Sequence, residues 1–249
     1  MTARARRHGR RPRGVDLRRT ARERHELRTI YVVAEGERTE YDYFLHLDGA
    51  HGRRLGFHIK IPNPATRRNG LQPGLVVEEA ARVADDPDID EAWAPFDHDC
   101  RPDIPRVCTE ARRKGVRIAL SHPAFELWLL LHFRDQLPGA QGGHNNEIIA
   151  RLRRIHLAFA DYDARRGPAG GGKRINDRRF EALYQDNGIT EAVRQSRMLI
   201  DQCLNDRDCT ARNGHAPSCD PADRDPSTDV YLLIHSLGIV PAPHGHARG

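Results

Sequence analysis

The sequence predicts an α/β fold: a mostly parallel four-stranded sheet flanked by helices, with a C-terminal helical extension. Strand-like and helix-like segments alternate as far as residue 137, the order typical of parallel sheets. The run at 29–34 is rich in β-branched residues and shows no polar alternation, as expected of a central strand covered on both faces. From about residue 138 the helical segments are separated by polar, turn-rich stretches instead of strands.

The expected strands occupy residues 29–34, 57–61, 91–96 and 116–120. The second alternates polar and apolar residues before Pro62, which indicates an edge or half-exposed strand. The first helix is expected to begin with Thr39 as its N-cap. Hydrophobic periodicity then predicts helices at 74–85, 105–114, 125–133, 145–159, 178–185, 189–204 and 229–237.

Four segments of different composition follow from this assignment. Residues 1–28 are expected to be a disordered basic arm, 29–137 the α/β domain, 138–240 a helical extension packed on it, and 241–249 a tail. The arm holds eleven arginines and three acids, about +8, whereas the remainder is about −3. Such an arm can bind a phosphate backbone, and a solubilising tail is the alternative. The nucleic-acid-binding candidates are Arg6, Arg7, Arg10, Arg11 and Arg13.

Composition also limits where the protein acts. The sequence contains no apolar run long enough to cross a membrane and no signal-peptide pattern at its start. Five cysteines, an odd number, fit a reduced compartment better than a disulfide framework. We therefore expect a soluble, cytoplasmic protein without membrane association.

Carboxylates follow two of the expected strands. Glu35 and Glu37 come directly after the first, and Asp97 and Asp99 after the third. Because the carboxyl ends of parallel strands share one edge of a sheet, one acidic cluster is expected there. Carboxylates in such a cluster suit Mg²⁺ or Mn²⁺, and Glu35 or Glu37 could add a ligand or act as general acid or base. The alternative is that Asp99 only caps the next helix.

Several further polar residues carry predictions. Glu126 lies on an otherwise apolar helix and is expected either at the same edge of the sheet or as a partner of amides at the helix start. His98 is expected to point away from its acidic neighbours, and His132 to be structural. Lys173 follows three glycines, and because the Walker A spacing is missing this stretch is interpreted as a flexible linker.

Four potential zinc ligands occur in the turn-rich stretch near the C-terminus, namely Cys203, Cys209, His215 and Cys219. Zinc prefers four such ligands. Their spacing, C-x₅-C-x₅-H-x₃-C, misses the usual C-x₂₋₄-C knuckle. We therefore do not expect zinc here and predict a mobile loop with incidental thiols.

The order of these motifs resembles known families. Glu35-Gly36 followed by Asp97-x-Asp99 is similar to the Toprim arrangement, which implies Glu35 as acid/base residue and the two aspartates as metal ligands. Glu40 matches a further acid that follows the Glu-Gly pair in overcoming-lysogeny-defect (OLD) family nucleases and their relatives, which makes it a further candidate metal ligand. Residues 28–238 resemble the RloB-like family more closely, through the motifs at 32–44, 96–99, 121–133 and 225–230. His122 and Asp225 depart from that family, which commonly has Asn at both positions.

The RloB-like resemblance implies a Toprim-like metal-dependent nuclease fold. It also implies a separately encoded, RloA-like ATPase partner in bacterial anti-phage defence by abortive infection. The first hypothesis is accordingly a Mg²⁺-dependent (or Mn²⁺-dependent) nuclease that hydrolyses phosphodiester bonds. The alternative is a non-catalytic subunit that binds nucleic acid or the ATPase. A phosphohydrolase with Asp97 as nucleophile fits less well, and homo-oligomerisation stays open.

Overall fold

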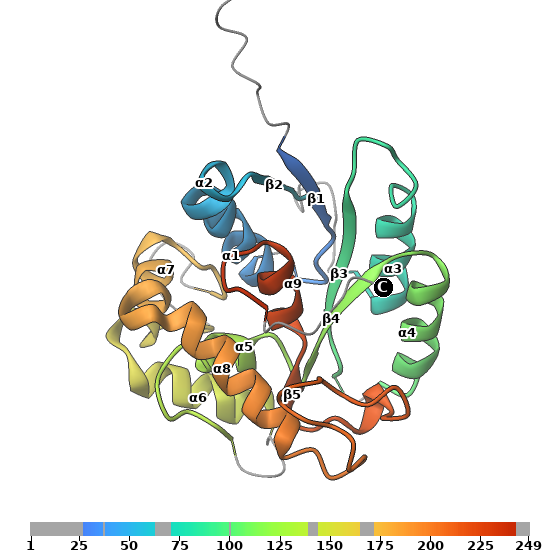
Figure 1. The fold of residues 1–249 in the computed structure, drawn as a ribbon. Coiled ribbons are helices and arrows are strands. Elements are labelled where there is room, and N and C mark those ends of the chain that lie inside the picture. Colours follow the sequence, from blue (N-terminus) through green and yellow to red (C-terminus); the bar gives the residue numbers. More distant parts are fainter. Residues whose placement is uncertain are drawn as a thin grey trace, which may run out of the picture.

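The fold is described from a computed structural model, which places residues 27–36, 38–62, 71–99, 101–138, 144–164 and 172–242 (Figure 1). A π-helical turn at Asp48–Gly52 joins helix α1 (Thr39–Leu47) to helix α2 (Arg53–Leu55). The strands and helices are β1 (Arg28–Val32), α1 (Thr39–Leu47), α2 (Arg53–Leu55), β2 (Phe57–Lys60), α3 (Pro73–Ala81), β3 (Glu91–Asp97), α4 (Ile104–Arg113), β4 (Arg117–His122), α5 (Glu126–Leu130), α6 (Asn145–Ile155), α7 (Asp177–Tyr184), α8 (Gly188–Asp201), β5 (Ser227–Thr228) and α9 (Val230–Ser236).

The sheet has the strand order β2-β1-β3-β4-β5. Its first four strands are parallel, and β5 runs antiparallel to β4. This arrangement confirms the predicted α/β fold with a mostly parallel sheet, and β2 lies at the edge as expected. The fifth strand is an addition that the sequence did not predict, because two residues carry no detectable alternation.

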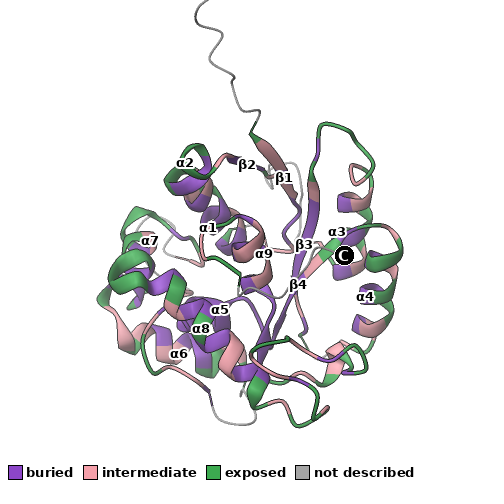
Figure 2. Ribbon diagram, viewed as in Figure 1, coloured by how far each residue is buried: buried purple, intermediate pink, exposed green. Residues whose placement is uncertain are grey.

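Helices cover both faces of the sheet and create two cores. Alternate residues of β1 show why, since Ile30 and Val32 belong to one core and Tyr31 between them packs against the other. The larger core contains α1, α5 and α9, and the smaller contains α3 and α4 (Figure 1). Figure 2 shows the strands buried between these layers. The larger core also includes Ile148, Leu152 and Leu199, so the C-terminal helices share it with the sheet.

Three local predictions are corrected by the backbone. Thr39 is the first residue of α1 and not its N-cap, which is Arg38 without a side-chain cap. Asp99 caps no helix, because α4 begins at Ile104 after Asp103. The helix expected over 145–159 ends at Ile155, because His156 has an extended backbone (φ −146°, ψ 134°). A short 3₁₀ turn, Leu157–Phe159, then completes the buried stripe.

Within the ranges placed by the structure, no helix is both long and apolar enough to span a bilayer.

Candidate functional site at the acidic edge of the sheet

Glu35 and Asp97 lie side by side at the carboxyl edge of the sheet. Their positions follow from the pairing of β1 with β3, in which Val32 lies opposite Trp93. The pairing continues beyond β1, where the Glu35 amide donates to the Pro95 carbonyl at 3.2 Å. The Asp97 amide in turn donates to Glu35 Oε2 at 2.8 Å. Two acids that are 62 residues apart in the sequence are therefore neighbours.

A second amide fixes the other side of Asp97. The backbone N–H of Phe125, just after β4, donates to Asp97 Oδ1 at 2.8 Å. The loop between β4 and α5 therefore closes over the end of β3. One carboxylate oxygen of Asp97 and one of Glu35 are held by backbone donors, so both side chains have defined orientations.

Glu40 is brought to the same place by the turn into α1. It lies in the first turn of α1 and is buried. The Gly36 amide donates to Glu40 Oε1 at 3.2 Å. A Cβ atom at position 36 would lie 2.0 Å from Glu40 Oε2, so any side chain there would displace the carboxylate. The glycine of the Glu35-Gly36 pair therefore makes room for Glu40.

Glu126 is the most deeply buried acid of this edge, at 2% exposure. It is the first residue of α5, and its partners are side chains and not the amides considered from the sequence. Lys173 Nζ lies 2.8 Å from Glu126 Oε1, and the Tyr162 hydroxyl donates to the same oxygen at 3.1 Å. Asn145 Nδ2 donates to Oε2 at 3.2 Å. The ammonium group compensates a negative charge that would be costly to bury without a partner.

Lys173, Tyr162 and Asn145 are site residues that sequence reasoning missed. Lys173 was interpreted as part of a flexible linker, whereas the structure places its ammonium group against Glu126. The Thr39 hydroxyl helps to hold this segment by donating to the Lys173 carbonyl at 2.6 Å. The three residues come from different segments of the C-terminal half, so no local motif could have revealed them.

These acids surround a cavity of about 520 Å³. Among the described residues that line it, five carry carboxylates and only two carry cations. The excess of negative charge can be relieved in two ways: the cavity can bind a cation, or some of its carboxyl groups can retain a proton. The charged lining residues are Glu35, Glu40, Asp97, Asp99, Glu126, Arg38 and Lys173.

Crowding and burial change the acidity of three carboxyls. Burial raises the pKa of Glu35 to about 7, with Asp99 adding repulsion and the Asp97 amide opposing the change. Burial also raises the pKa of Glu40 to about 7, with further repulsion from Glu126 and Glu35. Burial and the same acidic neighbours raise the pKa of Asp97 well above its usual range. The three groups therefore interact as one cluster.

The remaining predicted site residues have varied positions. Asp99 lines the cavity from an exposed turn with φ 45°, and Glu37 lies outside the described residues. The arm arginines, Arg6, Arg7, Arg10, Arg11 and Arg13, also lie outside them. His98 stacks on His122 with ring centroids 3.9 Å apart. His132 is structural as predicted, because the Tyr43 hydroxyl and the Trp128 carbonyl lie 3.0 and 2.9 Å from its ring nitrogens.

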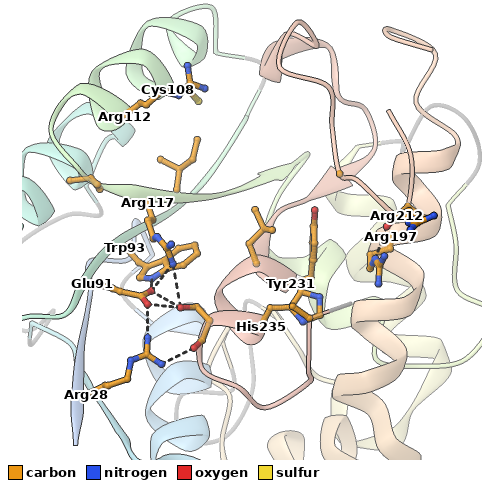
Figure 3. A pocket seen from close by; sticks show the side chains of 17 residues that line it. Arg28, Glu91, Trp93, Cys108, Arg112, Arg117, Arg197, Arg212, Tyr231 and His235 are labelled. Atoms are coloured by element: carbon orange, nitrogen blue, oxygen red, sulfur yellow. Dashed lines mark hydrogen bonds and ion pairs between the residues drawn. The ribbon is translucent and has the colours of Figure 1, made fainter. Parts of the chain in front are cut away.

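A second cavity, of about 610 Å³, opens near the other ends of the strands (Figure 3). Glu91, which begins β3, accepts hydrogen bonds there from Arg28, Arg117 and Ser236. These contacts and burial have opposite effects, and the net pKa of Glu91 is lowered. This acid is therefore neutralised by its own partners, as Glu126 is by Lys173, whereas Glu35 and Asp97 are held by backbone amides.

The fold and this edge define an α/β protein whose ionisable site lies where the parallel strands of the sheet end. The chain belongs to the RloB-like protein family, whose sequence model matches residues 30–237. Searches of curated proteins and of solved structures returned no match.

Proposed function

We propose that the chain is a metal-dependent nuclease that hydrolyses phosphodiester bonds. The observation that carries this proposal is the contact of Glu35 with Asp97 across neighbouring strands, beside Glu40, Asp99 and Glu126 in one cavity. Had the first two acids been far apart, no shared site could exist. The resemblance to Toprim-like enzymes supports the same assignment of roles.

The chemical type of the donors suits Mg²⁺ or Mn²⁺, although among the described residues no three of these acids already converge on one point. Hard divalent cations prefer carboxylate oxygens, and the excess negative charge of the cavity favours their entry. Asp97 and Asp99 would hold the ion, with Glu40 as a further ligand. When bound, the ion supplies electrostatic stabilisation of a scissile phosphate.

Glu35 is proposed as the general acid/base. A group with a pKa near the working pH exchanges protons most effectively, and burial raises the pKa of Glu35 to about 7. The Asp97 amide fixes one oxygen of Glu35 at 2.8 Å. The other oxygen has no hydrogen bond to a described residue and can receive or deliver the proton.

The direct test is cleavage of end-labelled DNA and RNA by the full chain with Mg²⁺ or Mn²⁺. We expect Asp97→Asn and Glu35→Gln to reduce the rate by about 10²–10⁴-fold, the usual loss for a catalytic acid or base. Asp88→Asn, an exposed aspartate before β3, is the matched control and should cleave normally. Cleavage that persists unchanged in Asp97→Asn, or that is absent from every preparation even with an ATPase partner, would contradict the proposal.

Action on nucleic acid and in defence completes the proposal. The charge of the arm, about +8 over residues 1–28, supports binding to a phosphate backbone. Family resemblance supports anti-phage defence together with an ATPase encoded separately. Whether the substrate is DNA or RNA is an outcome of the same cleavage assay.

One observation favours a non-catalytic binding subunit as the second candidate. The cluster already has internal partners, since Lys173 neutralises Glu126 and backbone amides hold Glu35 and Asp97. In that case Mg²⁺ would not bind, and Asp97→Asn would leave nucleic-acid affinity and thermal stability in Mg²⁺ unchanged. Calorimetric titration of Mg²⁺ into the wild-type chain and the variant separates the two candidates.

A further inference from the structure

The segment between α8 and β5 gathers four potential metal ligands at one point. Cys203, Cys209, His215 and Cys219 each direct one ligand atom there, and these atoms all lie within 4.8 Å of one another. Among the described residues, no other group of three or more Cys, His, Asp or Glu side chains meets this condition. The fold thus joins residues whose sequence spacing gave no reason to expect zinc.

Two of the distances between these atoms match a tetrahedral site. Ligands about 2.3 Å from a tetrahedral zinc ion are separated by about 3.8 Å when both are thiolates. Cys203 Sγ lies 3.7 Å from Cys219 Sγ, and Cys219 Sγ lies 3.8 Å from His215 Nδ1. A disulfide would join only two sulfurs, at about 2.0 Å. It would leave unexplained why a third cysteine and an imidazole converge on the same point.

Neighbouring groups provide one amide donor and one positive charge. The Ala216 amide lies 3.3 Å from Cys209 Sγ and donates to it, a contact that favours the charged sulfur. Three thiolates and one Zn²⁺ carry a net charge of −1. Arg224 lies beside them, with Nη2 donating to the Cys219 carbonyl at 3.0 Å and Nη1 3.5 Å from Asp229. A partly buried cation is therefore available to balance the site.

The segment also has very little apolar core of its own. Between residues 204 and 225 the buried residues are Cys209, Ala216 and Cys219, and none has a large apolar side chain. Long connections without secondary structure are uncommon in compact domains unless something holds them. Figure 1 shows this segment running from α8 past β5 toward α4. A metal would replace the missing core and fix the start of β5.

We infer that Cys203, Cys209, His215 and Cys219 form a structural zinc site that fastens the connection between α8 and the edge of the sheet. Four protein ligands leave no open position for substrate, which is the arrangement of structural and not catalytic zinc. The site is separate from the acidic edge and does not depend on the proposed nuclease activity.

The test is the metal content of the full chain purified without chelator, measured by plasma mass spectrometry. We expect one zinc per chain, reduced at least tenfold in Cys203→Ser and in Cys219→Ser. Cys108→Ala is the matched control, because Cys108 is a buried cysteine of α4 outside the cluster, and it should keep its zinc. Asp97→Asn should keep it too, which distinguishes this site from the acidic edge.

Replacement of zinc by Co²⁺ gives a spectroscopic readout in the wild-type chain, so this part of the test does not require a destabilised variant to fold. Co²⁺ should produce the visible bands of a tetrahedral ion and a thiolate charge-transfer band in the near ultraviolet. His215→Cys should retain the ion and strengthen the charge-transfer band, because a fourth thiolate replaces the imidazole. A folded wild-type chain without zinc and without these Co²⁺ bands would overturn the inference, as would zinc that persists in the double variant Cys203→Ser/Cys219→Ser.

Discussion

Five carboxylates share one cavity, and the interaction of each with its neighbours decides what each can do. Glu126 is satisfied by Lys173, Tyr162 and Asn145, so its charge is stabilised within the protein. Among the described residues, Glu35 and Asp97 accept hydrogen bonds from backbone amides, and burial and repulsion by acidic neighbours raise their pKa values. At the scale of single residues, Glu126 is therefore held by side-chain partners, whereas Glu35 and Asp97 are the acids to which the proposed function assigns the chemistry.

Removing the cation from the Glu126 pair should destabilise the fold. Lys173→Met leaves a carboxylate of 3% side-chain exposure without its ammonium partner at 2.8 Å. Loss of one partner of a buried pair costs about 3–5 kcal/mol, and the partial exposure of Lys173 reduces the expected loss to about 1–3 kcal/mol. Urea denaturation at pH 8 measures this change in the free energy of unfolding.

The double variant Lys173→Met/Glu126→Gln provides the control for this prediction. Because the amide needs no cation, the second substitution should recover most of the lost stability. A double variant that is as unstable as the sum of the two single variants would show that the ion pair contributes no coupling energy.

His132 should make stability depend on pH. Burial lowers its pKa from 6.5 to about 4. The unfolded chain takes up a proton at this residue below pH 6.5, whereas the folded chain does so only near pH 4. Stability is therefore fully present above pH 6.5 and is lost as the pH falls toward 4, by about 3 kcal/mol. The measurement is the free energy of unfolding from pH 7 to pH 4.

His132→Gln isolates this contribution, because glutamine does not titrate. The wild type should lose about 3 kcal/mol more than His132→Gln over this range. The exposed His144→Gln serves as the matched control and should keep the wild-type profile. Parallel curves for the wild type and His132→Gln would show that His132 is protonated to the same extent in both states.

At the scale of elements, the contact between α7 and α8 depends on one glycine. A Cβ at Gly188, the first residue of α8, would lie 2.0 Å from the Leu183 carbonyl oxygen and 3.2 Å from that of His132. Both are backbone atoms, so the helices themselves would have to separate. Gly188→Ala should therefore cost about 1–3 kcal/mol, as overpacking usually does, measured as the decrease in the free energy of unfolding.

Gly74→Ala in α3 is the matched control for Gly188→Ala. No atom lies within 4 Å of a Cβ built at Gly74. Alanine is also the better helix former, so this variant should be at least as stable as the wild type. Equal stability of the two variants would contradict the packing argument at Gly188.

The elements that could be predicted are those with a periodic pattern of their own. β1 through β4 and the helices around them were expected because alternating or continuous apolar runs define them locally. β5 was missed because Ser227 and Thr228 are defined by their partners on β4, where Ser121 and Thr228 share a hydroxyl hydrogen bond of 2.9 Å. A strand of two polar residues exists only through such tertiary pairing.

The site, like the fold, has parts that follow from a local sequence pattern and parts that depend on tertiary contacts. Glu35, Asp97 and Asp99 follow strands directly, so the rule that parallel strands end at one edge brought them together. Lys173, Tyr162 and Asn145 reach Glu126 from the C-terminal half of the chain. The packing of that half on the sheet creates these contacts, and no spacing within the sequence encodes them.

At the scale of the whole molecule, positive and negative charge lie in different parts of the chain. The body, about −3 and with an acidic cavity, should repel a phosphate backbone, and the arm of about +8 should attract it. The active edge, if it acts on nucleic acid, therefore depends on the arm to bring substrate near. Affinity and cleavage should be separable: changes in the arm alter binding and its salt dependence, and changes at the acidic edge alter the rate.

Neutralising the arm tests this division in the full chain. Replacing five arginines by glutamine lowers the net charge from +5 to 0, and each lost phosphate contact reduces the slope of log K against log salt by about 0.9 for duplex DNA. We expect weaker binding and a slope smaller by up to about 4.5 in titrations at several salt concentrations. A control variant removes equal charge from exposed body positions and should keep the wild-type slope; an equal loss in both would contradict a specific role of the arm. The arm set is Arg6, Arg7, Arg10, Arg11 and Arg13, and the body set is Arg53, Arg54, Arg82, Arg106 and Arg113.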